Sequence, residues 1–227
     1  RDTTICSGNS VQLNVTGGSS YTWTPSTGLS NPTIANPLAT PTTTTQYVVS
    51  STSSGCSLKD TVNITVNQPT VAEAGTDTTV CTSAYVLQAT AASGQASGIW
   101  SVASGSGSVS NPSQPNSSVS NLSVGVNKLV WTVTVPGCTA VQDTLYITRS
   151  TLPAPVFAGV DTAVCGSLVT LNAAIPQVGQ GTWSVISGTA QFLDIHEPKT
   201  SVSGLSAGSN TLVWTVENFP CPLSKDT

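Results

Sequence analysis

The six cysteines are the residues of this sequence with the most definite chemistry. Zinc binding needs four convergent ligands, whereas the cysteines come two at a time and the single histidine lies near only the last two. We therefore expect disulfides between cysteines that are successive in the chain, which would indicate an oxidising, extracellular location. The expected bonds are Cys6–Cys56, Cys81–Cys138 and Cys165–Cys221.

An Asp-Thr dipeptide recurs beside these cysteines. If successive cysteines bond, Asp77 and Asp143 would be drawn toward one end of their segment, where two carboxylates could begin a calcium site. The alternative is that each aspartate begins a strand or hydrogen-bonds a turn. We expect no obligatory cofactor, with calcium at Asp77 and Asp143 as the one candidate.

No group of residues in the sequence is typical of catalysis. His196 lies near Asp194 and Glu197, but a surface histidine beside carboxylates is common, and the chain has no P-loop or dinucleotide fingerprint. The sequence therefore predicts that the protein is not an enzyme.

The cysteines belong to a repeat. AGTDTTVC at 74–81 is matched by AGVDTAVC at 158–165, and each is followed by a G-x-W-S-V segment and by LVWTV. Residues 1–67 form a looser copy in which Trp23 takes the position of Trp100 and Trp183, and Tyr47 that of Trp131 and Trp214. A residue repeated at a strand centre indicates core packing rather than sugar stacking. We expect three modules, 1–68, 69–151 and 152–227, joined by short proline-containing linkers that favour stiff joints.

Hydrophobic residues alternate with polar ones in each module, as in Val11, Leu13 and Val15. This period of two, broken by Gly, Ser, Asn and Pro clusters, predicts an all-β protein of three tandem immunoglobulin-like or PKD-like β-sandwiches. In the first two copies a closing strand follows Asp-Thr, whereas the third copy reaches Asp-Thr at 226–227. We therefore expect that module to lack its closing strand.

Composition excludes several classes of function. Only 7% of the residues are charged, with a net charge of −4. Nucleic-acid binding needs clustered Lys and Arg, and the six basic residues are scattered. No apolar run approaches the length of a membrane span, of about 20 residues.

The YTWTPSTGL segment from Tyr21 and the AGTDTTVC…LVWTV…C…DT pattern resemble extracellular PKD-like and immunoglobulin-like repeats of Bacteroidota surface proteins, such as gliding-motility adhesins and type IX secretion cargo. The resemblance implies a PKD-like module 1–68 and two immunoglobulin-like repeats, 69–151 and 152–227. It also implies O-glycosylation of the threonine in each Asp-Thr pair, at Thr3, Thr61, Thr78, Thr144 and Thr162.

The function that this resemblance implies is a structural stalk or filament of a large secreted or cell-surface adhesin, with neighbouring repeats of the same longer chain as its partners. One alternative is a module that binds polysaccharide or a partner through loops such as Ser104–Ser118 or Gln191–Thr200. Another is a spacer of a secreted hydrolase.

Overall fold

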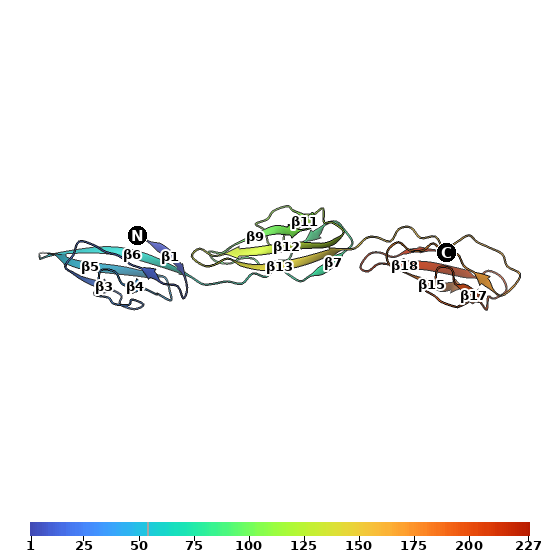
Figure 1. Ribbon diagram of the computed structural model, residues 1–227, viewed down its shortest axis with the longest axis horizontal. Helices are drawn as coiled ribbons and strands as arrows, with labels where there is room; N and C mark the ends of the chain where they lie inside the picture. Colours follow the sequence, from blue (N-terminus) through green and yellow to red (C-terminus); the bar gives the residue numbers. More distant parts are fainter. Residues whose placement is uncertain (54) are drawn as a thin grey trace.

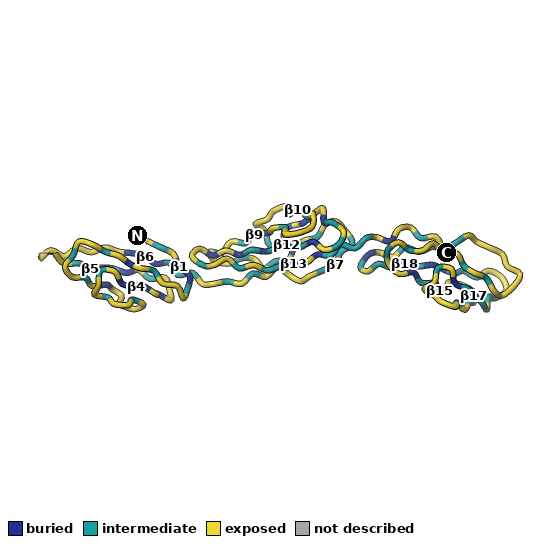
Figure 2. The backbone as a smooth tube through the Cα atoms, viewed as in Figure 1, coloured by how far each residue is buried: buried dark blue, intermediate teal, exposed yellow. Residues whose placement is uncertain are grey.

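The computed structural model describes residues 1–53 and 55–227, and these form β-strands and loops without a helix. Three β-sandwich modules follow one another in a line, so that the molecule is a rod (Figure 1). Each module has its own cluster of buried side chains, and buried segments alternate with exposed ones along the rod (Figure 2). The all-β class and the three tandem sandwiches are confirmed. We keep 1–68, 69–151 and 152–227 as the ranges of modules 1, 2 and 3.

Module 1 contains a four-stranded sheet and a two-stranded one. The large sheet has the order β1 (Thr3–Cys6), β6 (Cys56–Asn67), β5 (Thr45–Ser53) and β3 (Ser20–Thr24). The small sheet pairs β2 (Val11–Gln12) with β4 (Leu38–Ala39). The leading strand β1 runs parallel to β6, and the other pairs are antiparallel.

Module 2 repeats this plan. Its large sheet has the order β7 (Thr78–Val80), β13 (Val141–Arg149), β12 (Gly125–Thr134) and β9 (Ser97–Ser104). Its small sheet contains β10 (Ser108–Val109), β11 (Ser118–Ser120) and β8 (Tyr85–Val86). The leading strand β7 is again parallel to the closing strand, here β13.

Module 3 has the same small sheet but a shorter large one. The small sheet contains β14 (Val169–Thr170), β17 (Ser201–Ser203) and β16 (Gln191–Phe192), and the large sheet contains β15 (Gln180–Ser187), β18 (Thr211–Glu217) and β19 (Ser224–Asp226). Because β19 ends at Asp226, it lacks positions equivalent to Ile147–Arg149, with which β7 pairs. The leading segment 158–165 accordingly forms no strand, and a groove of about 990 Å³ lies between it and residues 205–212.

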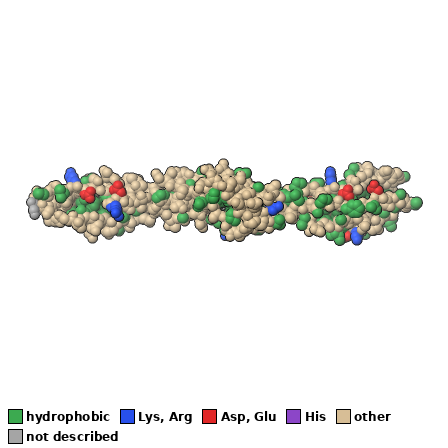
Figure 3. Space-filling model, turned by 90° about the horizontal axis from the view of Figure 1, so that it is seen from above, with side chains coloured by type: hydrophobic (Ala, Val, Ile, Leu, Met, Phe, Trp, Pro, Cys, Tyr) green, Lys and Arg blue, Asp and Glu red, His purple; other side chains and the backbone are tan. Residues whose placement is uncertain are grey.

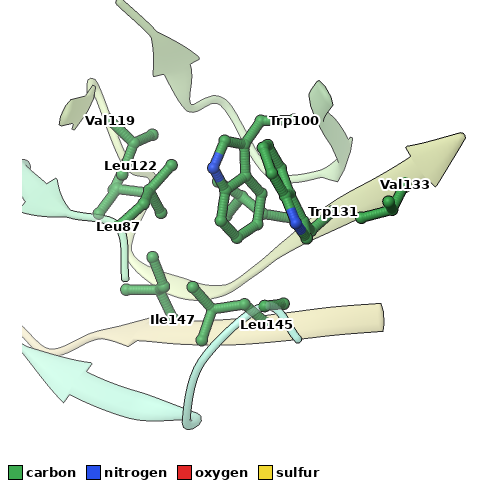
Figure 4. Close-up of a cluster of buried hydrophobic side chains, with 10 residues drawn as sticks. Leu87, Trp100, Val119, Leu122, Trp131, Val133, Leu145 and Ile147 are labelled. Atoms are coloured by element: carbon green, nitrogen blue, oxygen red, sulfur yellow. The ribbon is translucent and has the colours of Figure 1, made fainter. Parts of the chain in front are cut away.

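The core of module 2 shows how the repeated tryptophans pack. Trp100 and Trp131 lie opposite each other on adjacent strands with ring centroids 5.1 Å apart, and Leu145 and Ile147 from β13 cover them (Figure 4). A Cβ on Gly98 would lie 2.1 Å from the Trp131 ring, so only glycine leaves room for the indole.

Strand register confirms one tryptophan assignment and corrects another. Trp23 faces Val49 across the sheet of module 1, just as Trp100 faces Trp131, so Trp23 holds the expected position. The position of Trp131 is thus taken by Val49, and Tyr47 lies two residues earlier. Alternation puts both residues on the buried face, which explains why the sequence pattern did not distinguish them.

Candidate functional site

Two disulfides join neighbouring modules, and they are the features of this molecule with the clearest functional meaning. Cys6 of module 1 bonds Cys138 of module 2, with Cα atoms 4.7 Å apart. Cys81 of module 2 bonds Cys221 of module 3, with Cα atoms 5.1 Å apart. The expected pairs Cys6–Cys56, Cys81–Cys138 and Cys165–Cys221 are therefore wrong. Cys56 and Cys165 are exposed free thiols.

The reason for this correction is that the two cysteines of a module lie at opposite ends of it. Cys6 lies beside Asn67, whereas Cys56 begins the same twelve-residue strand β6. At ~3.3 Å per residue that strand separates them by about 36 Å, and a disulfide needs Cα atoms within about 7 Å. In module 2, β13 separates Cys81 from Cys138 in the same way.

The first cysteine of each bonded pair ends a leading strand or follows it directly, and the second lies in the turn before a closing strand. The sequence led us to expect the bonds within one module. The parallel pairing of leading and closing strands, which sends the two cysteines to opposite ends, leaves no signal in the hydrophobic alternation. The repeat alone does not distinguish pairing within a module from pairing with the next one.

The junction between modules 1 and 2 is closely packed around its disulfide. Gly137, with φ +78°, lies directly against β1, since a Cβ there would be 2.9 Å from the carbonyl carbon of Ile5. The side-chain amide of Asn67 donates a hydrogen bond of 2.9 Å to the carbonyl oxygen of Pro136. A disulfide, a backbone contact and a hydrogen bond thus hold module 1 against the turn between β12 and β13 of module 2.

The second junction repeats the first. Ser150, which is equivalent to Asn67, donates its hydroxyl to the carbonyl oxygen of Phe219, at 3.5 Å. Asn218 adds a hydrogen bond of 2.7 Å from its side-chain amide to the carbonyl oxygen of Thr151. Because both junctions use the same two positions relative to the cysteines, the repeat encodes the joint as well as the module.

The recurring aspartates hold each leading segment on its own closing strand. Asp143 accepts a hydrogen bond of 2.7 Å from the backbone N–H of Ala74, and Asp226 accepts an equivalent one of 2.9 Å from Ala158. In the reverse direction, Asp77 accepts from the backbone N–H of Tyr146 at 2.9 Å.

Module 1 uses the same device at Asp2, which accepts from the backbone N–H of Asn63 at 2.9 Å and from its side-chain amide at 3.2 Å. These bonds, the backbone one first, lower the pKa of the Asp2 carboxyl because they favour its charged form. The carboxylate candidates for calcium, Asp77 and Asp143, are thus engaged by backbone N–H groups. Within residues 1–53 and 55–227, no third His, Cys, Asp or Glu completes a metal-binding group with them.

The threonines of the Asp-Thr pairs differ in accessibility. Thr61 and Thr162 are exposed, whereas Thr3, Thr78 and Thr144 are half-buried in or beside the leading and closing strands. O-glycosylation at these five threonines stays a prediction, and the two exposed hydroxyls are the most accessible to it.

His196 holds its loop on strand β15. Its Nδ1 lies 3.0 Å from the carbonyl oxygen of Gly181 and 3.3 Å from the Thr182 hydroxyl, while its backbone N–H donates to Asp194. These contacts give His196 a structural role in the loop.

The two loops that the sequence offers for ligand binding share one framework. In the first, the Ser117 hydroxyl accepts from the backbone N–H of Asn111, and in the second the Thr200 hydroxyl accepts from that of Asp194, each at 2.9 Å. Ser104–Ser118 and Gln191–Thr200 therefore differ in side chains rather than in architecture.

The surface of the rod carries few charges. In Figure 3 the blue and red side chains are scattered among polar and hydrophobic ones without forming a patch of one sign. No helix that could cross a membrane occurs in the part of the chain that the structure describes.

Comparison with solved structures places the fold among tandem immunoglobulin-like domains. An I-band fragment of titin, domains I67–I69, aligns over 99% of this chain and 92% of its own, with 15% identity and a TM-score of 0.56. An E-to-A variant of the same three domains covers 99% of this chain and 93% of its own, with 14% identity and a TM-score of 0.54. No family model matches the sequence, and neither does any curated protein. The likeness shows that this chain is a tandem array of three immunoglobulin-like domains.

Proposed function

We propose that this chain is a load-bearing stalk segment of a secreted or cell-surface protein, such as a bacterial adhesin. The observation that carries the proposal is that a disulfide crosses each junction between modules. Disulfides are typical of oxidising compartments outside the cytosol, which supports an extracellular location. Reach and stiffness are the properties that this arrangement supplies.

The crossed disulfides shorten the covalent path through the molecule. From Arg1 the path can pass from Cys6 to Cys138, return along the chain to Cys81 and pass to Cys221. This route contains roughly 70 residues and can extend to about 240 Å, whereas the full chain could extend to about 800 Å. Even if every sandwich unfolded under load, the disulfides would therefore limit the extension of the stalk to about a third of that of the full chain.

The low charge of the surface fits the same role. A stalk that is exposed along its whole length benefits if it attracts other molecules only weakly. A surface with few charges, scattered on the face that Figure 3 shows, attracts few charged partners. We further propose that the protein is a bacterial surface protein exported by the type IX route, as its sequence pattern suggests. Its partners would be neighbouring repeats of the same longer chain.

Small-angle scattering tests the shape in solution. Three modules in line give a rod on the order of 100 Å and a radius of gyration of about 29 Å, against about 17 Å for a compact globule of this length. The variant with both C56S and C165S prevents cross-linking between molecules during the measurement. A radius near the globular value would refute the stalk.

Pulling the chain from its two ends tests the load-bearing role. We expect a maximum extension of about 240 Å for the oxidised chain and of about 800 Å after reduction. The C56S and C165S double variant is the matched control, since it loses both free thiols but neither junction bond. An oxidised chain that extends as far as the reduced one would show that the disulfides do not carry load.

A further inference from the structure

The free cysteines occupy the same two positions in the sequence repeat as the bonded ones. At both junctions the first cysteine of one module bonds the second cysteine of the following module. Cys165 is the first cysteine of module 3, and Cys56 is the second cysteine of module 1. Each therefore has the position of a half-cystine whose partner lies in a further module.

Cys56 shares one local feature with Cys138 of the first junction. Each follows a glycine with positive φ, namely Gly55 at +83° and Gly137 at +78°. The backbone of Gly137 lies against Ile5 of the neighbouring module, whereas a Cβ on Gly55 would meet nothing within 4 Å. The β5–β6 end of module 1 forms one end of the rod (Figure 1).

The segment around Cys165 lacks the cover that its counterparts have. Ile5, which precedes Cys6, is 7% exposed, whereas Val164, which precedes Cys165, is 44% exposed. Ile5 and Val80, which precede Cys6 and Cys81, pack in the cores of their own modules, whereas Val164 lacks such a contact within the described part of the chain because β19 ends before the positions that would pair with this segment.

We propose that Cys56 and Cys165 are complementary half-cystines that bond further modules of this same repeat at the two ends of the chain. Cys165 would bond the second cysteine of a following module, and Cys56 the first cysteine of a preceding one. In each bond two thiols lose two protons and two electrons to a disulfide oxidant, such as glutathione disulfide, which is reduced to two thiols. The inference rests on the proposed function because it names the partner of the stalk at each end.

A second copy of the chain serves as the probe, since its Cys56 has the position of the second cysteine that Cys165 requires. The C56S variant, labelled with ¹⁵N, is mixed with unlabelled C165S, and both are oxidised with glutathione disulfide. We expect covalent dimers in which Cys165 of one copy is linked to Cys56 of the other, in roughly tenfold excess over symmetric dimers. Intact mass and peptide mapping identify the linkage, and the wild-type chain should form a ladder of longer multimers.

The controls separate specific docking from random thiol oxidation. Each variant oxidised alone should remain mostly monomeric, and the mixture oxidised in urea should pair at random. Symmetric dimers, random proportions under native conditions, or no dimers would each overturn the proposal. The C56S and C165S double variant cannot form these bonds, so its scattering tests the stalk independently of them. A failure of this proposal can therefore be distinguished from a failure of the proposed function.

Discussion

Modules 2 and 3 have closely similar sequences, yet they differ in the part of the sheet that joins one module to the next. In module 2 the leading residues Thr78–Val80 form β7 on the closing strand β13. In module 3 the equivalent residues 162–164 form no strand, because β19 ends before the positions that would pair with them. The hydrogen bond from the backbone N–H of Ala158 to Asp226 is retained in module 3.

The leading segment therefore becomes a strand where the closing strand is long enough to pair with it. TDTTVC and VDTAVC have similar composition, and only TDTTVC, which pairs with Ile147–Arg149 of β13, becomes β-structure. The same dependence applies to cysteine position, since the closing strand is what carries the leading cysteine to the junction end of the module.

Hydrogen exchange should give the largest difference between the two modules. The amides of β7 should exchange at least about a hundredfold more slowly than those of residues 162–164, because only β7 pairs with a closing strand. A peptide with the sequence of residues 143–149, added in excess, should fill the groove of module 3 and slow exchange across 158–165. A peptide of scrambled sequence should have no effect, and equal exchange in the two leading segments would contradict the comparison.

Glycine substitutions should sharpen the comparison at the level of the core. A Cβ on Gly98 or Gly181 would lie 2.1 or 2.0 Å from the Trp131 or Trp214 ring, so G98A and G181A should each cost about 3 kcal/mol through overpacking. We expect the melting temperature of the affected module to fall by roughly 10–20 °C, with module 3 the lower of the two because its sheet is shorter. Thermal unfolding followed by tryptophan fluorescence measures the effect.

The control for this pair is G166A, since no atom lies within 4 Å of a Cβ there and its φ is not positive. This variant should melt within the error of the wild-type chain. A G98A variant as stable as G166A would show that the indole of Trp131 can move away from its position.

A buried asparagine should give the smallest of the three differences. Asn127 exchanges hydrogen bonds with Ser123 and also donates to the carbonyl oxygen of Ile147 on the closing strand. Asn210 makes the equivalent bonds with Ser206, and within residues 1–53 and 55–227 it makes no bond to a closing strand. We expect N127A to lower the free energy of unfolding by about 2–3 kcal/mol and N210A by about 1 kcal/mol less.

Urea denaturation measures both changes, with N116A as the control because Asn116 is exposed. Equal losses for N127A and N210A would show that the bond to the closing strand adds no stability.

Much of the fold could be predicted from the sequence because it depends on local regularities. Alternation of apolar and polar residues predicts strands with one buried face, and the repeat of Trp100 at Trp183 predicts the same core in successive modules. The exchange of Tyr47 for Val49 marks the limit of this argument, since a period of two defines the face of a residue but not its partner across the sheet.

The candidate site was predicted in its residues but not in its connections. The cysteines, the recurring aspartates and the three-module repeat follow from the amino-acid sequence by itself, because each is a matter of residue type and spacing. Which cysteine meets which was decided only by the tertiary structure. A parallel leading strand, paired with the far end of the closing strand, separates the two cysteines of one module by the length of the sandwich, and in module 2 it brings each of them to a cysteine of a neighbouring module.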